Sequence, residues 1–310
     1  MYKHFNLKDR FMLETLLGQD YELLDIAQVL GRSPSSIGRE LFRNSRADGS
    51  YEARHAHMKS KHRRQKSKIK YRKIENDLEL ANRIIERLNP LISPEVIAHD
   101  ENVSTETIYA WISRSRLDLK TLLPQHGKKR RRYGTKRTLK QGWTRDLRAI
   151  SERSIGANNR SRVGHFEGDT IRLDGGAILT HTDRKSRFEI AHLMKSEEAG
   201  PAHEIIKNDK LLKIAKSITY DRGSTFSLWR YIEKDTTAKV FFALARHPWE
   251  RGTNENANGR LRRIFPKGTR YADVDQKKLD EIVNLMNNTK RKCLNWRTPK
   301  EVFMGNCTSN

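Results

Sequence analysis

The chain has 310 residues, long enough for two or three modest domains, and carries 62 Lys and Arg against 38 Asp and Glu, a formal net charge of +24 at pH 7. This surplus favours a polyanionic partner, because neutralised phosphates release their condensed counterions. No apolar run approaches the roughly 20 residues of a membrane span, and the first residues do not resemble a secretory signal. Two cysteines, Cys293 and Cys307, are too few for a disulfide framework. We expect an intracellular protein that binds nucleic acid.

The first 50 residues predict three short helices, at about 8–18, 22–30 and 34–43. Gly31, which separates the last two, suits a left-handed turn, and Ser33-Pro34 can cap and open the third helix. This is the pattern of a helix-turn-helix, whose second helix enters the DNA major groove. Its outward side chains are the predicted DNA contacts: Ser35, Ser36, Arg39 and Arg43.

The same pattern recurs after residue 75. Ala98, Asn102 and Ile108 are spaced like the corresponding residues of the first unit, and Asn also tolerates a left-handed turn. Ser104 can cap a helix that continues through Ile112, after a longer helix at about 75–88. The predicted DNA contacts of this second helix-turn-helix are Thr105, Thr107 and Tyr109. Either unit alone could be a plain helical hairpin, but two copies separated by a basic run favour DNA binding.

Positive charge is concentrated in two stretches. Between Lys59 and Lys73, nine of fifteen residues are Lys or Arg and none is acidic, and a second run is uninterrupted. Like charges at this density repel each other until phosphate neutralises them. We therefore predict basic linkers at residues 51–74 and 123–158. The second linker is expected to bind DNA through its run of Lys128, Lys129, Arg130, Arg131 and Arg132.

From Gly164 onward the sequence predicts a mixed α/β domain. Three strands come first and helices then alternate with two more strands, which is the element order of the ribonuclease H fold with its mixed five-stranded sheet. The expected strands are residues 165–173, 177–183, 188–194, 217–220 and 239–243. The expected helices are residues 201–212, 224–234 and one that begins near 252.

Three carboxylates fall where phosphodiester chemistry would need them. Asp169 lies inside the first strand, Asp221 just past the fourth, and Glu255 on the first turn of the last helix, with 33 residues between the second and the third. Carboxylates are the ligands of Mg²⁺ or Mn²⁺, and phosphodiester cleavage uses two such ions to activate the attacking oxygen and stabilise the leaving one. We predict that Asp169, Asp221 and Glu255 are the catalytic and metal-binding residues.

Other interpretations stay open for these acids. A single Asp or Glu is usually a solvated surface group, and Glu250 competes with Glu255 because both lie near the helix entrance. Glu167 alternates with Asp169 on the same strand face, and a structural role is expected for it. The polar face of the helix carries cations that we expect to meet DNA phosphate: Arg260, Arg262, Arg263 and Lys267.

Four segments resemble motifs of insertion-sequence transposases of the IS30 family, within the DDE recombinase superfamily. They are GHFEGDT, TYDRGSTF, HPWERGTNENANGRLRRIFPKGT and NNTKRKCLNWRTPKEVF, and GRSPSSIGREL and SPEVIA match the family's helix-turn-helix units. The resemblance covers nearly the whole chain. It implies that Asp169, Asp221 and Glu255 form the catalytic triad, and it suggests a circular transposon intermediate. Arg222 and Thr225 depart from the family pattern without removing a metal ligand.

The expected organisation is multidomain, with all-α DNA-binding domains before the α/β catalytic domain. Its segments are a helix-turn-helix at 1–50, a linker at 51–74, a second helix-turn-helix at 75–122, a linker at 123–158 and the catalytic domain at 159–310. The expected partners are terminal inverted repeats and target DNA, bound by a homodimer or larger homo-oligomer in the bacterial cytoplasm, nucleoid-associated when bound and without a membrane. The rival functions are a non-catalytic DNA-binding regulator and a ribonuclease-H-type nuclease that does not join strands.

Overall fold

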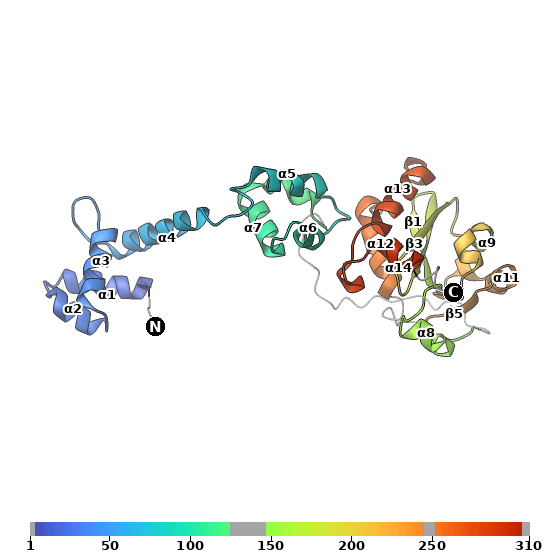
Figure 1. Cartoon of the computed structure of the whole chain (residues 1–310), viewed down its shortest axis with the longest axis horizontal. Helices are drawn as coiled ribbons and strands as arrows, with labels where there is room; N and C mark the ends of the chain where they lie inside the picture. Colours follow the sequence, from blue (N-terminus) through green and yellow to red (C-terminus); the bar gives the residue numbers. More distant parts are fainter. Residues whose placement is uncertain (1–3, 125–146, 245–251, 306–310) are drawn as a thin grey trace. The chain divides into compact units, whose positions relative to one another are not determined.

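The computed structural model describes residues 4–124, 147–244 and 252–305 (Figure 1). It divides into two compact units, residues 1–79 and 80–310. Within the described ranges, no helix is long and apolar enough to cross a membrane.

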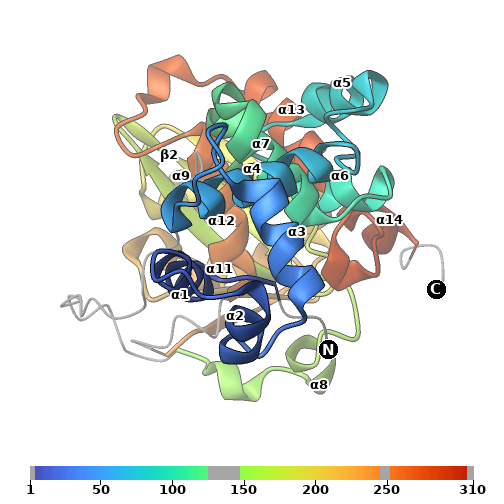
Figure 2. The same cartoon turned by 90° about the vertical axis from the view of Figure 1, so that its left-hand side faces the viewer.

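The first unit contains the expected three-helix cluster, shown in Figure 1 and from another side in Figure 2. Its helices are α1 (Leu7–Leu17), α2 (Leu23–Val29) and α3 (Pro34–Asn44). They pack around the buried side chains of Leu13, Ile26 and Ile37. Gly31 adopts φ +59° between α2 and α3, as its position predicted, because a side chain is strained in that conformation. The helix-turn-helix geometry is therefore present.

The basic segment at residues 51–74, which was predicted to be a linker, is mostly helical and packs on α1. Helix α4 (Ala53–Ile69) occupies most of it. Ala53 and Ala56 are buried on one face, and the buried Arg10 of α1 donates to the hydroxyl of Ser60 at 3.2 Å. Small residues three and four apart create a packing face, while Lys and Arg are good helix formers on the others. Charge density alone concealed that face.

The second unit begins with the repeated helix-turn-helix. It consists of α5 (Leu78–Arg87), α6 (Pro94–Asp100) and α7 (Thr105–Ser115). Asn102 takes the left-handed turn at φ +51°, and the Ser104 hydroxyl accepts a 3.1 Å hydrogen bond from the backbone of Thr107. The turn and the cap are both where the sequence predicted them.

A five-stranded mixed sheet forms the centre of the second unit (Figure 1). The strands are β1 (His165–Leu173), β2 (Gly176–Asp183), β3 (Glu189–Met194), β4 (Ser217–Tyr220) and β5 (Lys239–Phe242), in the order β3-β2-β1-β4-β5. The first three strands are antiparallel, and β4 and β5 run parallel to β1. This topology confirms the predicted ribonuclease-H-like fold.

Helices cover both faces of the sheet (Figure 1). On one face lie α9 (Ala199–Asn208), α10 (Lys210–Lys213) and α11 (Trp229–Asp235), and on the other α12 (Gly252–Ile264) and α13 (Gln276–Asn287). The chain also forms the short helices α8 (Ile155–Asn158) and α14 (Pro299–Met304). The single helix expected at 201–212 is divided, because Asp209 caps the backbone N–H groups of Leu211 and Leu212. A 3₁₀ turn at 224–226 likewise precedes α11.

The second helix-turn-helix packs directly on the catalytic domain, although the sequence predicted separate domains. Leu91 belongs to the core formed by α12 and α13. The ring of His99 stacks on Trp296 with centroids 3.9 Å apart. Burial would raise the pKa of Asp100, but hydrogen bonds from Lys290 and Arg87 outweigh it and hold that pKa well below its usual range. These contacts join residues far apart in the chain into one unit.

One buried acid of β3 makes stability depend on pH. Burial raises the pKa of Glu189 to about 8, against a hydrogen bond from Thr182 that lowers it. The folded chain therefore keeps a proton between pH 4.5 and 8 that the unfolded chain loses, so Glu189 contributes stability at low pH that is lost as pH rises through 8.

We expect Glu189→Gln to flatten this dependence, because Gln cannot ionise. The free energy of unfolding of the parent should fall relative to the variant by about 1 kcal/mol per pH unit across that window. Guanidinium unfolding of both proteins at pH 5.5 and pH 8 measures the difference. Equal pH slopes would show that Glu189 ionises in the folded chain as it does in water.

Candidate active site and DNA-binding surfaces

Two of the three predicted carboxylates lie on neighbouring parallel strands. The register pairs Glu167 of β1 with Thr219 of β4. Asp169 and Asp221 each follow two residues later, the first still inside β1 and the second immediately after β4. Parallel strands advance together, so the two aspartates reach the same end of β4 side by side. The sheet topology thereby brings together residues that are 52 positions apart.

Helix α12 presents its polar face to this pair. The Asn258 side-chain amide donates to Oδ2 of Asp169 at 3.1 Å, and the Thr170 backbone donates to Oδ1 at 2.9 Å. Glu255 is exposed and precedes Asn258 by three residues, so both project from the same side of the helix. The contact between Asn258 and Asp169 thus turns the face that carries Glu255 toward the aspartates.

Glu167 anchors the beginning of α12, as its strand position suggested. Its side chain is fully buried and forms an ion pair with Arg184. Its Oε2 accepts hydrogen bonds of 3.0 Å from the backbones of Thr253 and Asn254, and the Asn254 amide donates to the Glu167 carbonyl at 2.8 Å. A carboxylate satisfies the free N–H groups at a helix start and favours the positive end of the helix dipole. Glu167 therefore fixes Glu255 in place without itself reaching the other carboxylates.

Gly168 lies between Glu167 and Asp169 on β1 and was not among the predicted site residues. A Cβ at this position would lie 2.2 Å from the ring of Tyr220, which is fully buried and whose hydroxyl is 2.9 Å from Nε2 of His181. Only glycine lets β1 pass this close to Tyr220. The sequence feature that could have revealed this contact is a glycine inside a strand, which often marks a place where another group lies close to the backbone.

Gly168→Ala is expected to destabilise the second unit by about 1–3 kcal/mol, because the added methyl group overpacks the core. Thermal unfolding measures the loss. Gly259→Ala is the matched control: a Cβ there meets no atom within 4 Å, and Ala is the better helix former in α12. An unchanged melting temperature for Gly168→Ala would contradict the tight packing.

The donor set suits a hard divalent cation, although the ligands are not gathered into a complete shell. Asp169, Asp221 and Glu255 offer only carboxylate oxygens, the donors that Mg²⁺ and Mn²⁺ prefer. Oδ1 of Asp221 accepts a 3.0 Å hydrogen bond from the Gly223 backbone, which orients it. In the parts of the chain that the structure describes, no three His, Cys, Asp or Glu side chains are close enough to hold a metal ion.

The predicted DNA contacts of the two helix-turn-helix units lie on the expected helices. Ser35, Arg39 and Arg43 are exposed on α3, and Ser36 is half-buried there. On α7, Tyr109 is exposed, whereas Thr105 and Thr107 are half-buried. The basic run at Lys128, Lys129, Arg130, Arg131 and Arg132 lies outside the described residues, and so does Glu250.

The structure corrects the prediction for Arg260. Its side chain is only 4% exposed, and its guanidinium donates to the Leu91 carbonyl at 2.7 Å instead of facing solvent. Arg263 is half-buried and donates to the Pro90 carbonyl at 2.8 Å. Both arginines hold the second helix-turn-helix against α12. Arg262 is half-buried and Lys267 exposed, so their contact with DNA stays a prediction.

A ribonuclease-H-like sheet with one acid inside β1 and another just past the adjoining β4, preceded by two helix-turn-helix units, defines a DNA-processing protein. Residues 1–44 match a family model described as a helix-turn-helix domain. The chain is 33% identical to the transposase InsI of insertion element IS30A from Escherichia coli, over 97% of this chain and 83% of that protein. It is 32% identical to the transposase of IS4351 from Bacteroides fragilis, over 98% and 96%. The chain belongs to the IS30 family of insertion-sequence transposases.

Two further proteins are similar to this chain. The transposase of IS1086 from Cupriavidus metallidurans is 33% identical, over 97% of this chain and 94% of that protein. Among solved structures, the catalytic core domain of BIV integrase matches 47% of this chain and 97% of its own length, at 17% identity and a TM-score of 0.36.

Proposed function

We propose that this chain is a DNA transposase that binds the terminal inverted repeats of an insertion sequence and catalyses strand cleavage and strand transfer. The observation that carries the proposal is the placement of Asp169 and Asp221 at one end of β4, under the α12 face that bears Glu255. Membership of the IS30 family supports it. The activity belongs in the bacterial cytoplasm, on nucleoid DNA.

Asp169, Asp221 and Glu255 would hold Mg²⁺ or Mn²⁺, as two ions. Such ions supply positive charge at the phosphodiester and lower the pKa of water. The chain contributes the orientation of its ligands: Asn258 fixes one oxygen of Asp169, and Glu167 fixes the start of α12. Orienting Asp169 in this way before DNA arrives reduces the reorganisation that cleavage requires.

The reaction consists of two phosphoryl transfers at one site. In the first, a water oxygen attacks the phosphorus at the element's end, the bond to the 3′ oxygen breaks, and that oxygen leaves as a 3′-hydroxyl after taking a proton. In the second, this hydroxyl loses its proton and attacks the phosphorus of a target phosphodiester; the bond to the target's 3′ oxygen breaks, and that oxygen takes a proton and leaves as a 3′-hydroxyl. No covalent protein intermediate forms. Helices α3 and α7 would read the repeats, and pairing two ends calls for a homodimer or larger assembly.

The test uses purified chain, Mg²⁺, labelled duplexes carrying the inverted repeats that flank its coding sequence, and an unlabelled target. We expect a nicked product first and a longer, joined product later, resolved on denaturing gels. Nicks without joining would identify a plain nuclease. Binding without either product would identify a regulator and end the transposase proposal.

A further inference from the structure

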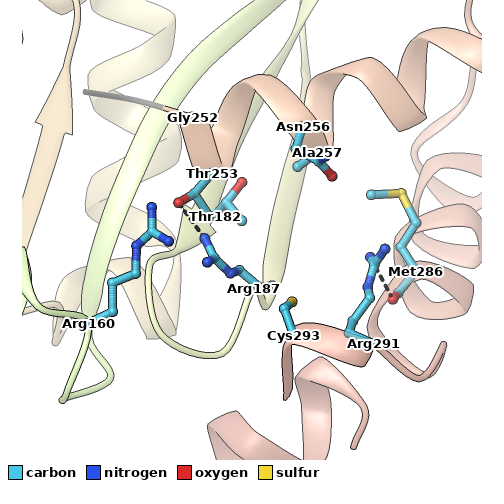
Figure 3. Close-up of a pocket in the computed structure, with 10 residues that line it drawn as sticks. All are labelled: Arg160, Thr182, Arg187, Gly252, Thr253, Asn256, Ala257, Met286, Arg291 and Cys293. Carbon is cyan, nitrogen blue, oxygen red and sulfur yellow. Dashed lines mark hydrogen bonds between the residues drawn. The ribbon is translucent and has the colours of Figure 1, made fainter. Parts of the chain in front are cut away.

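A cavity of about 310 Å³ lies beside the beginning of α12 (Figure 3). Thr253 and Asn256 line it, whereas Glu255 and Asn258 each lie two residues further on. Two residues in an α-helix correspond to a rotation of about 200°, so the cavity and the carboxylates occupy opposite faces of α12. The cavity is therefore a second site and not an extension of the first.

Three arginines from separate segments line this cavity. Arg160 follows α8, Arg187 lies in the turn between β2 and β3, and Arg291 comes after α13. Figure 3 shows Cys293 between Arg187 and Arg291, and the Arg187 guanidinium donating to the Thr253 hydroxyl, a distance of 2.6 Å. Arg160 and Cys293 are exposed, so the cavity is open to solvent.

Among the described residues that line this cavity, the three arginines give an excess of positive charge. None of its described lining residues is acidic. The charges of Glu167 and Glu189 act on Arg187 and Arg291, but Glu167 hydrogen-bonds to Arg184 and the α12 backbone, and Glu189 accepts from Thr182. Nε of Arg291 is buried and has no hydrogen-bond partner among the described groups. Each guanidinium group has five N–H donors, so these arginines can still donate to the oxygen atoms of a bound ligand.

The electrostatic cost of the arrangement is visible in the arginines themselves. Burial lowers the pKa of Arg187 and the charge of Arg160 lowers it further, while Cys293 and Glu167 oppose the shift. Burial also lowers the pKa of Arg291 to about 10; the Cys293 and Glu189 side chains oppose that shift, and Arg187 adds to it. Arg187 and Arg291 are half-buried, and an anion between the three side chains would relieve the repulsion between their charges.

We propose that the cavity lined by Arg160, Arg187 and Arg291 binds a phosphate group. Planar guanidinium groups match the spacing of phosphoryl oxygens and bind them in pairs. The group is either a backbone phosphodiester of DNA or free inorganic phosphate, because both present the same oxygens. Because Arg187 also donates to the Thr253 hydroxyl, phosphate bound in the cavity would stabilise the start of α12 on the face opposite Glu255.

Cys293 is a built-in reporter for this site. In a Cys307→Ser background Cys293 is the one remaining thiol. The rate of its alkylation by uncharged iodoacetamide, followed by mass spectrometry, therefore measures how accessible the cavity is. Inorganic phosphate at about four times its Kd should slow alkylation about fivefold relative to chloride at equal ionic strength. Arg160→Gln and Arg291→Gln should each abolish the protection. Arg162→Gln, an exposed arginine two positions from Arg160 that does not line the cavity, should keep it.

A parallel reaction with duplex DNA distinguishes the two sources. Protection by DNA that Arg160→Gln removes assigns a backbone phosphodiester, whereas protection by inorganic phosphate alone assigns the free anion. Alkylation rates that neither phosphate nor DNA changes, or protection that survives both Arg160→Gln and Arg291→Gln, would overturn the proposal. Alkylation requires no strand cleavage, so phosphate should protect Cys293 fully in the Glu255→Gln variant as well. A lack of protection in the parent protein would contradict the phosphate site and leave the transposase assignment untouched.

Discussion

Asp169→Asn should reduce both strand cleavage and strand transfer by about 10³-fold or more, equivalent to about 4 kcal/mol of activation free energy. The amide keeps the shape of the side chain and can still meet Asn258, but it removes the negative charge that a divalent cation requires. Glu167, the other acid on this face of β1, is held by Arg184 and the α12 backbone, so we do not expect it to replace Asp169. Initial rates of nicking and joining in Mg²⁺ measure the effect.

Asp174→Asn is the matched control, since this exposed acid lies just past the end of β1, five positions further along the chain. It should keep parental rates. Gel-shift binding to the repeat duplex should be the same for all three proteins, because α3 and α7 are unchanged. An Asp169→Asn protein that cleaves within tenfold of the parent would remove Asp169 from the catalytic group.

The largest loss of stability is expected from Glu167→Gln. This change leaves Arg184 buried without its counterion and deprives the α12 backbone of its carboxylate acceptor. Breaking a buried ion pair from one side costs about 3–5 kcal/mol. For a unit of this size we expect the melting temperature to fall by about 10 °C. Strand transfer should fall as well, since Glu255 loses its fixed position.

A double variant separates charge imbalance from the lost helix anchor. Glu167→Gln combined with Arg184→Met removes both charges and should recover part of the melting temperature. Strand transfer should stay low, because the anchor of α12 is still missing. A single Glu167→Gln variant as stable and active as the parent would show that the carboxylate neither compensates Arg184 nor positions α12.

Local sequence patterns were sufficient to predict the structure where a single residue, or an alternation of side chains along a strand, determines it. Gly31 and Asn102 took the left-handed turns assigned to them. The strand segments emerged within a residue or so of their expected bounds, because their apolar side chains face cores on both sides of the sheet. The expected positions of Asp169 inside β1 and of Asp221 just past β4 match the strand bounds of the structure.

Contacts between distant segments were beyond the sequence. Helix α4 was hidden by its charge, since only Ala53, Ala56 and Ser60 reveal a buried face. Arg260 was expected on the DNA-binding surface because nothing local indicates that the Leu91 carbonyl lies opposite it. Periodicity and motif spacing indicate which face of an element is buried, but not which distant residue lies against it.

A comparison of Glu255→Gln with Glu250→Gln in the strand-transfer reaction tests the carboxylate triad most directly. Both changes remove one negative charge near the start of α12, and Glu250 is the competing acid in the sequence. We predict that Glu250→Gln forms joined product at close to the parental rate, whereas Glu255→Gln forms none in Mg²⁺. Joined product from Glu255→Gln at the parental rate would contradict the assignment of Asp169, Asp221 and Glu255 as the catalytic carboxylates.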